Sequence, residues 1–394
     1  MARRVIVHVG AMKSGTTSLQ HALYAHRERL AELGILVPGQ TWRDQADAVW
    51  NLRGREKSLA GDRSIDGAWQ RLVDEIDGWP DTAIISAELL APVDDDVVER
   101  VAESLTSPEI VLSVRDLNRN LPAMWQEVVQ NGEVWAWPDF LASARVRRPR
   151  WPVPDVVTSA SRFWSEQDVV SIAKKWSTAG PVHVVTVPGP GAPREALLER
   201  FGEVIGFSFE DVPSQPSQNA SLGVVRTDLL RRLNLELDSR DLPYPAGIRL
   251  RKHMLAKKIL PGLDVEDERI GLRVEPWVEK VATQQIAGLH KLEVTLHGDW
   301  DDLMPVDVDG ADPSSVTDEQ IVSAAAATHV ELRAWLVRRA KKSPREGWGP
   351  ETVPEWAPRP GAATPGAAED AVDALADLIE WAITRRRAKQ ATDA

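Results

Sequence analysis

The stretch VIVHVGAMKSGTTSLQHAL, residues 5–23, decides the fold class of this 394-residue chain. Its β-branched start predicts a buried strand over residues 3–9. A loop with glycines at positions 10 and 15 follows, and residues 16–33 then repeat leucine at helical spacing. The stretch therefore predicts a strand, a glycine-rich turn and a helix in direct succession.

The turn of this unit has the composition of an anion-binding loop. Backbone N–H groups at the start of a helix point at one spot, and the helix dipole adds partial positive charge there. Thr16 and Thr17 bring hydroxyls to the first turn, and Lys13 adds a full charge from the loop. An NTP-binding loop, G-x-x-x-x-G-K-[ST], needs its lysine where this chain has Thr16, so a plain ATP or GTP site is disfavoured.

The run G-x-x-K-S-G-T-T resembles the 5′-phosphosulfate-binding loop of sulfotransferases, which use 3′-phosphoadenosine 5′-phosphosulfate (PAPS). The resemblance implies that Lys13 contacts the phosphosulfate and that no metal is required. It also implies that the loop amides and threonines hold the 5′-phosphate, at Ser14, Gly15, Thr16 and Thr17. A glycine-rich turn without a ligand is the alternative interpretation.

A second segment extends the resemblance. The family places an arginine after a later strand to hold the 3′-phosphate, and Arg115 follows the strand expected over residues 109–114. The serine expected eight residues further on is Ala123, so that phosphate ligand is missing or supplied elsewhere, with Gln126 and Arg119 as candidates. The alternative interpretation of Arg115 is a strand-end arginine paired with Asp116 or another acid.

Two later segments also resemble the family. Residues 219–234 are similar to a stretch of bacterial members that returns toward the cofactor, which makes Asn219 and Ser221 candidate contacts of the 3′-phosphate. A simple helix N-cap region is an equal alternative. Residues 297–305, HGDWDDLMP, resemble the G-D-L-x-x-L-x-P element of actinobacterial sulfotransferase-like proteins, and we interpret them as a sign of kinship rather than chemistry.

Sulfuryl transfer needs a cation at the leaving oxygen and a base for the proton of the acceptor. Lys13 is the candidate for the first role. The family resemblance implies a histidine or a glutamate base near a strand end, and Glu88 follows the strand expected over residues 82–86. The alternative for Glu88 is a helix-start glutamate favoured by the dipole. None of the eight histidines stands in a recognisable base motif.

Alternation of strands and helices up to about residue 220 predicts an α/β fold with a central parallel sheet flanked by helices. The resemblance to sulfotransferases implies that this sheet is P-loop-NTPase-like. Beyond that point strands become scarce, and a helical C-terminal extension is expected. The predicted division is a sulfotransferase-like domain, a helical extension, a Pro/Gly-rich linker and a C-terminal amphipathic helix, over residues 1–305, 306–342, 343–368 and 369–394.

Composition narrows the class of protein. The net charge of −12 argues against nonspecific binding of nucleic acid and of anionic membrane surfaces. The chain has no cysteine, which excludes disulfides and thiolate chemistry, and it lacks the run of about 20 apolar residues that spans a bilayer. We expect a cytoplasmic protein without integral membrane association.

The sequence thus predicts a PAPS-dependent sulfotransferase that acts on a hydroxyl or amine of a small-molecule, glycan, glycolipid or natural-product acceptor. Residues 41–54 and the tryptophan- and arginine-rich insert 131–154 are the segments expected to face that acceptor. A small-molecule kinase with an altered P-loop and a non-catalytic nucleotide-binding descendant are the alternatives.

Overall fold

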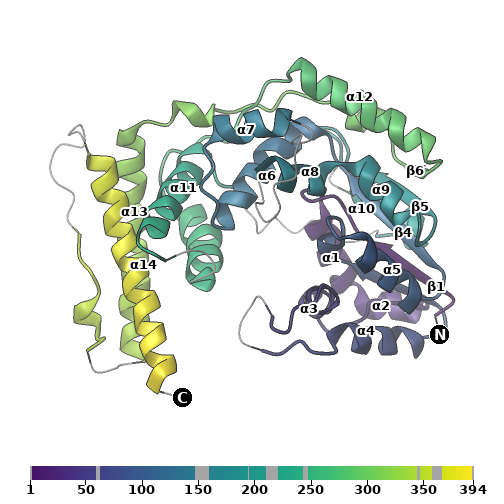
Figure 1. The fold of residues 1–394 in the computed structure, drawn as a ribbon, viewed down its shortest axis with the longest axis horizontal. Helices are drawn as coiled ribbons and strands as arrows, with labels where there is room; N and C mark the ends of the chain where they lie inside the picture. Colours follow the sequence, from purple (N-terminus) through teal and green to yellow (C-terminus); the bar gives the residue numbers. More distant parts are fainter. Residues whose placement is uncertain are drawn as a thin grey trace. The chain divides into compact units, whose positions relative to one another are not determined.

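The computed structural model describes residues 2–58, 63–146, 159–193, 195–209, 221–242, 247–343, 347–356 and 366–392. In this part of the chain six strands form one parallel sheet in the order β2-β3-β1-β4-β5-β6 (Figure 1). The strands are β1 Arg4–His8, β2 Ile35–Leu36, β3 Thr82–Ser86, β4 Pro108–Val114, β5 Val182–Thr186 and β6 Thr295–His297. The predicted α/β class with a parallel sheet flanked by helices is confirmed.

The chain divides into two compact units, and both are discontinuous in sequence. The first consists of Met1–Leu121, Ala144–Ser217 and Val274–Val306. The second consists of Pro122–Ser143, Gln218–Arg273 and Asp307–Ala394. The sheet unit therefore ends close to the predicted boundary at residue 305, but two segments that were predicted to belong to it fall in the second unit.

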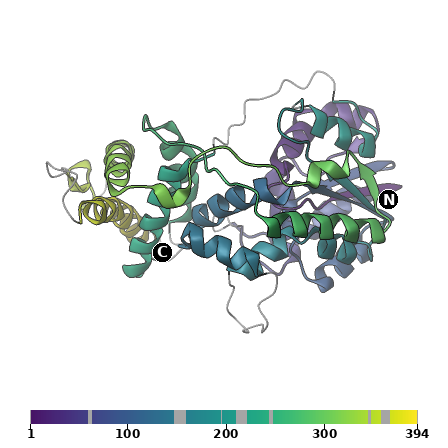
Figure 2. The ribbon, with the colours of Figure 1, turned by 90° about the horizontal axis from the view of Figure 1, so that it is seen from above.

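Helices cover both faces of the sheet in the first unit (Figure 2). Its α-helices are α1 Thr16–Ala25, α2 Arg27–Glu32, α3 Trp42–Leu52, α4 Ala68–Asp77, α5 Asp95–Ser104, α8 Ser159–Gln167, α9 Val169–Trp176, α10 Ala196–Ile205 and α12 Pro276–Lys291. Short 3₁₀ turns are η1 Glu88–Leu90 and η4 Trp300–Leu303. The helix α6, Leu117–Gln130, begins in this unit and continues into the second.

Strand β1 lies at the centre of the sheet, between β3 and β4. After β1 the chain continues beside β4, because the N–H of Val9 donates to Val111 O at 2.9 Å and that of Ala11 to Ser113 O at 2.8 Å. From β1 the chain proceeds toward the β2 edge, whereas from β4 it proceeds to β5 on the other side. Parallel sheets bind ligands at such a switch point, outside the carboxyl ends of the strands.

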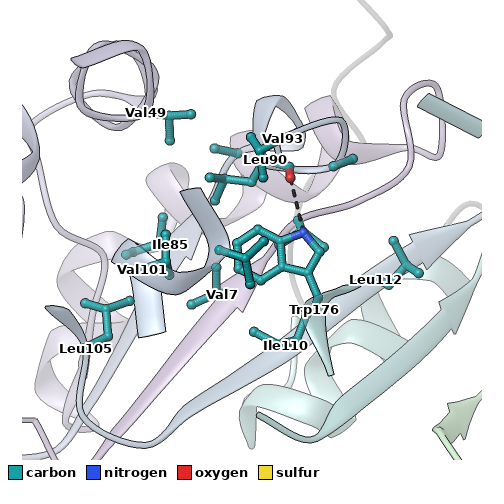
Figure 3. Close-up of a cluster of buried hydrophobic side chains, with 14 of the residues drawn as sticks. Val7, Val49, Ile85, Leu90, Val93, Val101, Leu105, Ile110, Leu112 and Trp176 are labelled. Carbon is teal, nitrogen blue, oxygen red and sulfur yellow. Dashed lines mark hydrogen bonds between the residues drawn. The ribbon is translucent and has the colours of Figure 1, made fainter. Parts of the chain in front are cut away.

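One face of the sheet packs on α1 and α10, with Leu19, Leu23 and Phe201 as buried members of that core. The opposite face packs on α5, α9 and neighbouring helices. Trp176 of α9 is fully buried there, among side chains such as Val7 and Ile110 of the strands (Figure 3). Its indole N–H donates to Leu90 O at 3.2 Å, so this core also fixes the turn η1.

The second unit contains a group of three mutually packed helices: α11 Val224–Ser239, α13 Asp318–Lys342 and α14 Ala367–Thr392. The same unit holds α7 Trp137–Arg145, the π-helix η2 Arg249–Ile259 and the short turns η3 Leu260–Gly262, η5 Pro313–Ser315 and η6 Pro350–Thr352. Arg240, after α11, pairs with Asp373, Asp377 and Glu380 of α14. No helix in the described part of the chain is long and apolar enough to cross a membrane.

Local expectations differ from the structure at three places. The single helix expected over residues 16–33 breaks at His26 into α1 and α2. In the region beyond residue 220, where strands were expected to be scarce, Arg249–Ile259 form a π-helix instead of an α-helix. Strands β2 and β6, of two and three residues, were not predicted, because runs this short carry no periodic pattern.

Candidate functional site

The loop between β1 and α1 depends on left-handed backbone at Gly10, Lys13 and Gly15, whose φ angles are +45°, +64° and +82°. A Cβ on Gly10 would lie 2.5 Å from Thr16 Cγ2, and one on Gly15 would lie 2.4 Å from Leu197 Cδ2. Both glycines are therefore required by close packing as well as by φ. Lys13 adopts positive φ despite its side chain, a form of strain that is common at functional sites.

Helix α1 begins without a side-chain cap. Gly15 occupies the N-cap position, and no side chain in the described part of the chain accepts a hydrogen bond from the first turn. The leading N–H groups of a helix have no intrahelical acceptor, so they remain available to an anion along the positive end of the dipole. Thr16 is buried and Thr17 is exposed, and Lys13 is half-buried in the loop.

Ser14 fastens this loop to the sheet. Its buried hydroxyl donates to Ala11 O at 2.5 Å and lies 2.7 Å from Ser113 Oγ. Ser113 Oγ is 3.0 Å from His8 Nε2, and His8 Nδ1 is 2.8 Å from Ser86 Oγ. The side chain of Ser14 is thus engaged within the protein. Burial lowers the pKa of His8 to about 3, so the ring is neutral at physiological pH.

Arg115 follows β4 directly, two residues beyond the Ser113 carbonyl that pairs with Ala11. Its side chain makes no hydrogen bond or ion pair with any described residue, and its Nε is buried without a partner. Asp116 pairs instead with Arg119, which also donates to Pro188 O at 3.0 Å. Burial, with the like charge of Arg119, lowers the pKa of Arg115 to about 10, so the guanidinium stays charged at neutral pH.

Arg115 is consequently a half-buried cation at the same sheet edge as the glycine-rich loop. The alternative in which it pairs with Asp116 is wrong, because Arg119 takes that carboxylate. Because Arg119 forms this ion pair with Asp116, its guanidinium is not an unpaired hydrogen-bond donor.

Glu88 opens η1 at the end of β3, on the other side of β1. Its half-buried carboxylate accepts a hydrogen bond from Gln20 Nε2 at 2.8 Å, and the same nitrogen donates to Ser86 O at 3.1 Å. Gln20 lies on α1, one turn beyond the paired threonines. The helix that begins at the loop therefore also positions Glu88.

The remaining predicted phosphate ligands are not part of the first unit or lie outside the described residues. Gln126 and Ser221 belong to the second unit, where Ser221 Oγ donates to Gln126 Oε1 at 2.7 Å and Gln126 Nε2 donates to Leu222 O. The side chains of Gln126 and Ser221 are thus hydrogen-bonded to each other. Ala123, on α6, is half-buried in the same unit. Asn219 lies outside the described residues.

The two segments expected to face an acceptor are mostly helical. Residues 42–52 form α3, which a capping box of Thr41 and Asp44 starts. In the insert 131–154, Trp137 of α7 is buried against Trp125 and Phe140 in the second unit. Arg145 pairs with Glu275 at 2.6 Å, and residues 147–154 lie outside the described part.

The element at residues 297–305 has a structural role. Asp302 accepts hydrogen bonds from Thr186 Oγ1 at 2.7 Å, Arg200 Nη1 at 2.6 Å and the N–H of Gly189 at 3.2 Å. Gly298 packs so closely on β5 that a Cβ there would lie 2.1 Å from Thr186 Oγ1. This element therefore fixes the end of β5 and the loop that follows it.

Sequence reasoning missed the polar residues that support the site. Ser86 and Ser113 are buried near the ends of the two strands that flank β1, and Gln20 and Gln45 bond to the Ser86 backbone. The available signal was a serine late in each of two strongly apolar strands, TAIIS and PEIVLSV. A comparison of the chain with protein-family models, with curated proteins and with solved structures finds no match.

Proposed function

We propose that the chain is a PAPS-dependent sulfotransferase with a P-loop-like fold, and that the carboxyl edge of β3, β1 and β4 is its active site. The observation that carries this proposal is the combination of an uncapped α1 N-terminus with Arg115, which follows the adjacent strand β4 and has no partner among the described residues. These are two separate positions for an anion on one sheet edge. PAPS carries phosphate groups at two separate places, whereas ATP carries one contiguous chain.

The residues present fit such a ligand. The first-turn amides and hydroxyls of Thr16 and Thr17 would hold the 5′-phosphate, while Arg115 would hold the 3′-phosphate. A phosphate oxygen would give the Nε of Arg115 the partner that no described residue supplies. Leaving a buried cation unpaired lowers stability, so its retention supports a binding role.

In the proposed reaction an acceptor hydroxyl forms a bond to sulfur while the bond from sulfur to the 5′-phosphate oxygen breaks. Lys13 neutralises the charge that grows on that phosphate oxygen. Glu88, held by Gln20, accepts the proton of the acceptor hydroxyl. The acceptor is a small molecule or a carbohydrate, the reaction needs no metal, and the protein works in the cytoplasm under this proposal.

The first experiment measures thermal stability with adenosine 3′,5′-bisphosphate (PAP) and, separately, with ATP and Mg²⁺. A ligand at about 100 times its dissociation constant adds roughly 2.7 kcal/mol to the free energy of unfolding. We expect PAP to stabilise the wild type and ATP–Mg²⁺ to do little. The variant Arg115→Met should lose the PAP effect, and Arg71→Met, which changes an exposed arginine on α4, should keep it.

Stabilisation by ATP–Mg²⁺ without any effect of PAP would replace the proposal with the kinase alternative. PAP binding combined with no sulfate transfer to any acceptor in a broad screen would favour a non-catalytic descendant. Lys13→Ala separates these cases further, because PAP lacks the sulfonate: the variant should bind PAP but lose turnover.

A further inference from the structure

Two helices of the second unit, α13 and α14, lie side by side and run in the same direction (Figure 1). One contact shows that the two helices run in the same direction: Ser343, directly after α13, accepts a hydrogen bond from Arg385 late in α14. Arg385 Nε also donates to Trp348 O at 3.3 Å, which holds the connecting segment against the same end. The C-terminal ends of both helices therefore lie close together.

This shared end carries a cluster of exposed cations that we call the basic tip. None of its side chains forms a hydrogen bond or an ion pair with a described residue. Its members are Arg338, Arg339, Lys341 and Lys342 of α13 and Arg386 and Arg387 of α14. The acidic residues of the two helices lie in their N-terminal and middle turns, and the last of them are Glu331 in α13 and Glu380 in α14.

The dipoles of the two helices compensate only part of the positive charge of the basic tip. Each helix C-terminus carries roughly −0.5 of an elementary charge, so two of them offset about one of the six cations. Like charges four residues apart, such as Arg338 and Lys342, repel each other and destabilise a helix. An isolated fold gains nothing from this concentration, and an anionic partner would relieve it.

Tryptophan side chains lie beside the basic tip. The guanidinium of Arg339 lies 5.2 Å from the ring of Trp335, and that of Arg385 lies 5.7 Å from the ring of Trp381. The ring of Trp348 packs 5.8 Å from that of Trp381. Indole rings beside lysine and arginine are typical of protein surfaces at the headgroup level of a membrane.

We propose that the basic tip docks the protein on a membrane surface of anionic lipids. Six cations fall within the range of about four to eight that forms a lipid-binding polybasic cluster. Nucleic acid is the less favourable partner, because single strands stack their bases on open aromatic faces. Here arginines already lie over Trp335 and Trp381. The net charge of −12 hides this surface, since the cations are gathered at one end of the unit.

The test uses the full chain and co-sedimentation with vesicles of phosphatidylcholine alone, or with about one third phosphatidylglycerol. We expect binding to the anionic vesicles only, weakening sharply as salt rises from about 0.1 M to about 1 M. The triple variant Lys342→Gln, Arg386→Gln, Arg387→Gln should bind roughly 100-fold more weakly, since each cation near the surface contributes about fivefold. The charge-conserving triple Lys342→Arg, Arg386→Lys, Arg387→Lys should bind like the wild type.

A matched control neutralises three exposed lysines of the first unit: Lys174→Gln, Lys280→Gln and Lys291→Gln. It should change binding by less than about threefold, because these cations lie outside the proposed surface. If the neutralising triple of the basic tip and the control triple of the first unit weakened binding equally, only net charge would matter, and this result would overturn the proposal. So would equal binding to neutral vesicles, or binding of a labelled single-stranded DNA without binding of anionic vesicles. Circular dichroism melts confirm that each variant is folded.

Discussion

Asp116 forms its ion pair with Arg119, three residues along the chain, and leaves its immediate neighbour Arg115 without a partner in the described part of the chain. Both arginines are largely removed from solvent, yet they have opposite consequences for the fold. Arg119 satisfies a fully buried carboxylate, whereas Arg115 is a half-buried charge without a partner among the described residues.

Substitution of the two arginines should therefore separate stability from binding. Arg119→Ala leaves the Asp116 carboxylate buried without its cation and should lower the free energy of unfolding by about 3 kcal/mol. Arg115→Met should leave the stability of the free protein unchanged or slightly higher, while the stabilisation by PAP disappears. Urea unfolding with and without PAP measures both quantities. A large loss of stability in Arg115→Met would contradict the structural assignment.

Gly15→Ala tests the conformation of the loop. A left-handed residue with a side chain costs about 1–2 kcal/mol, and the contact with Leu197 adds an overpacking cost of about 1–3 kcal/mol. Gly54 has the same φ of +82° but no neighbouring atom within 4 Å of an added Cβ. Gly54→Ala should therefore show the backbone cost alone. Equal losses in the two variants, measured by chemical denaturation, would show that Leu197 does not constrain the loop.

His8 should make the protein sensitive to mild acid. Because burial lowers its pKa to about 3, the unfolded chain binds a proton that the folded protein excludes between about pH 6.5 and pH 3. Stability attributable to this residue is complete above pH 6.5 and falls by about 1.4 kcal/mol per pH unit below it. Urea unfolding across this range should show a shallower slope for His8→Gln. The exposed His21→Gln should retain the slope of the wild type, and an unchanged slope in His8→Gln would refute the assignment.

Asp302 should stabilise the end of β5 in a pH-dependent manner. Burial alone would raise the pKa of this carboxyl, but the hydrogen bond from Thr186 and the charge of Arg200 outweigh burial and lower it. A carboxyl with a lowered folded pKa contributes stability above its unfolded value, near 3.8, and loses it as pH falls through the folded pKa.

At neutral pH, Asp302→Asn should therefore cost about 1–3 kcal/mol through lost charged hydrogen bonds. The difference from the wild type should shrink below about pH 4. Its exposed neighbour provides the control, since the side chain of Asp301 makes no hydrogen bond with a described residue. If Asp301→Asn proved equally destabilising, the network around Asp302 would not be the cause.

Long periodic segments were predictable, and the physical reason is their burial. The strand expected over residues 82–86 matches β3 at both ends, and the helical extension expected over residues 306–342 contains α13, which ends at residue 342. The Gly-rich turn before Thr16 was predictable too, since only glycine suits its backbone and packing. The division into units was not, because interleaved segments depend on contacts between distant residues.

The candidate site residues could be predicted only where the local sequence indicates them. The pattern indicated Arg115, but the partner of Asp116 depends on whether Arg115 or Arg119 reaches it, and this is set by the start of α6. The role of Gln20 depends on β3 lying beside β1, a tertiary relation without a local signature. The partnership of Gln126 with Ser221 likewise joins residues far apart in sequence.

The interleaved connectivity of the two units has a consequence for biosynthesis. Strand β5 ends at Thr186, but the strand that covers its free edge begins about 110 residues later, at Thr295. At a translation rate of about 5–20 residues per second, the nascent chain carries an uncovered strand edge for roughly 5–20 s. Unpaired edges are templates for aggregation. We therefore expect recombinant yield to rise when translation is accelerated between these strands, or when a ribosome-associated chaperone is supplied.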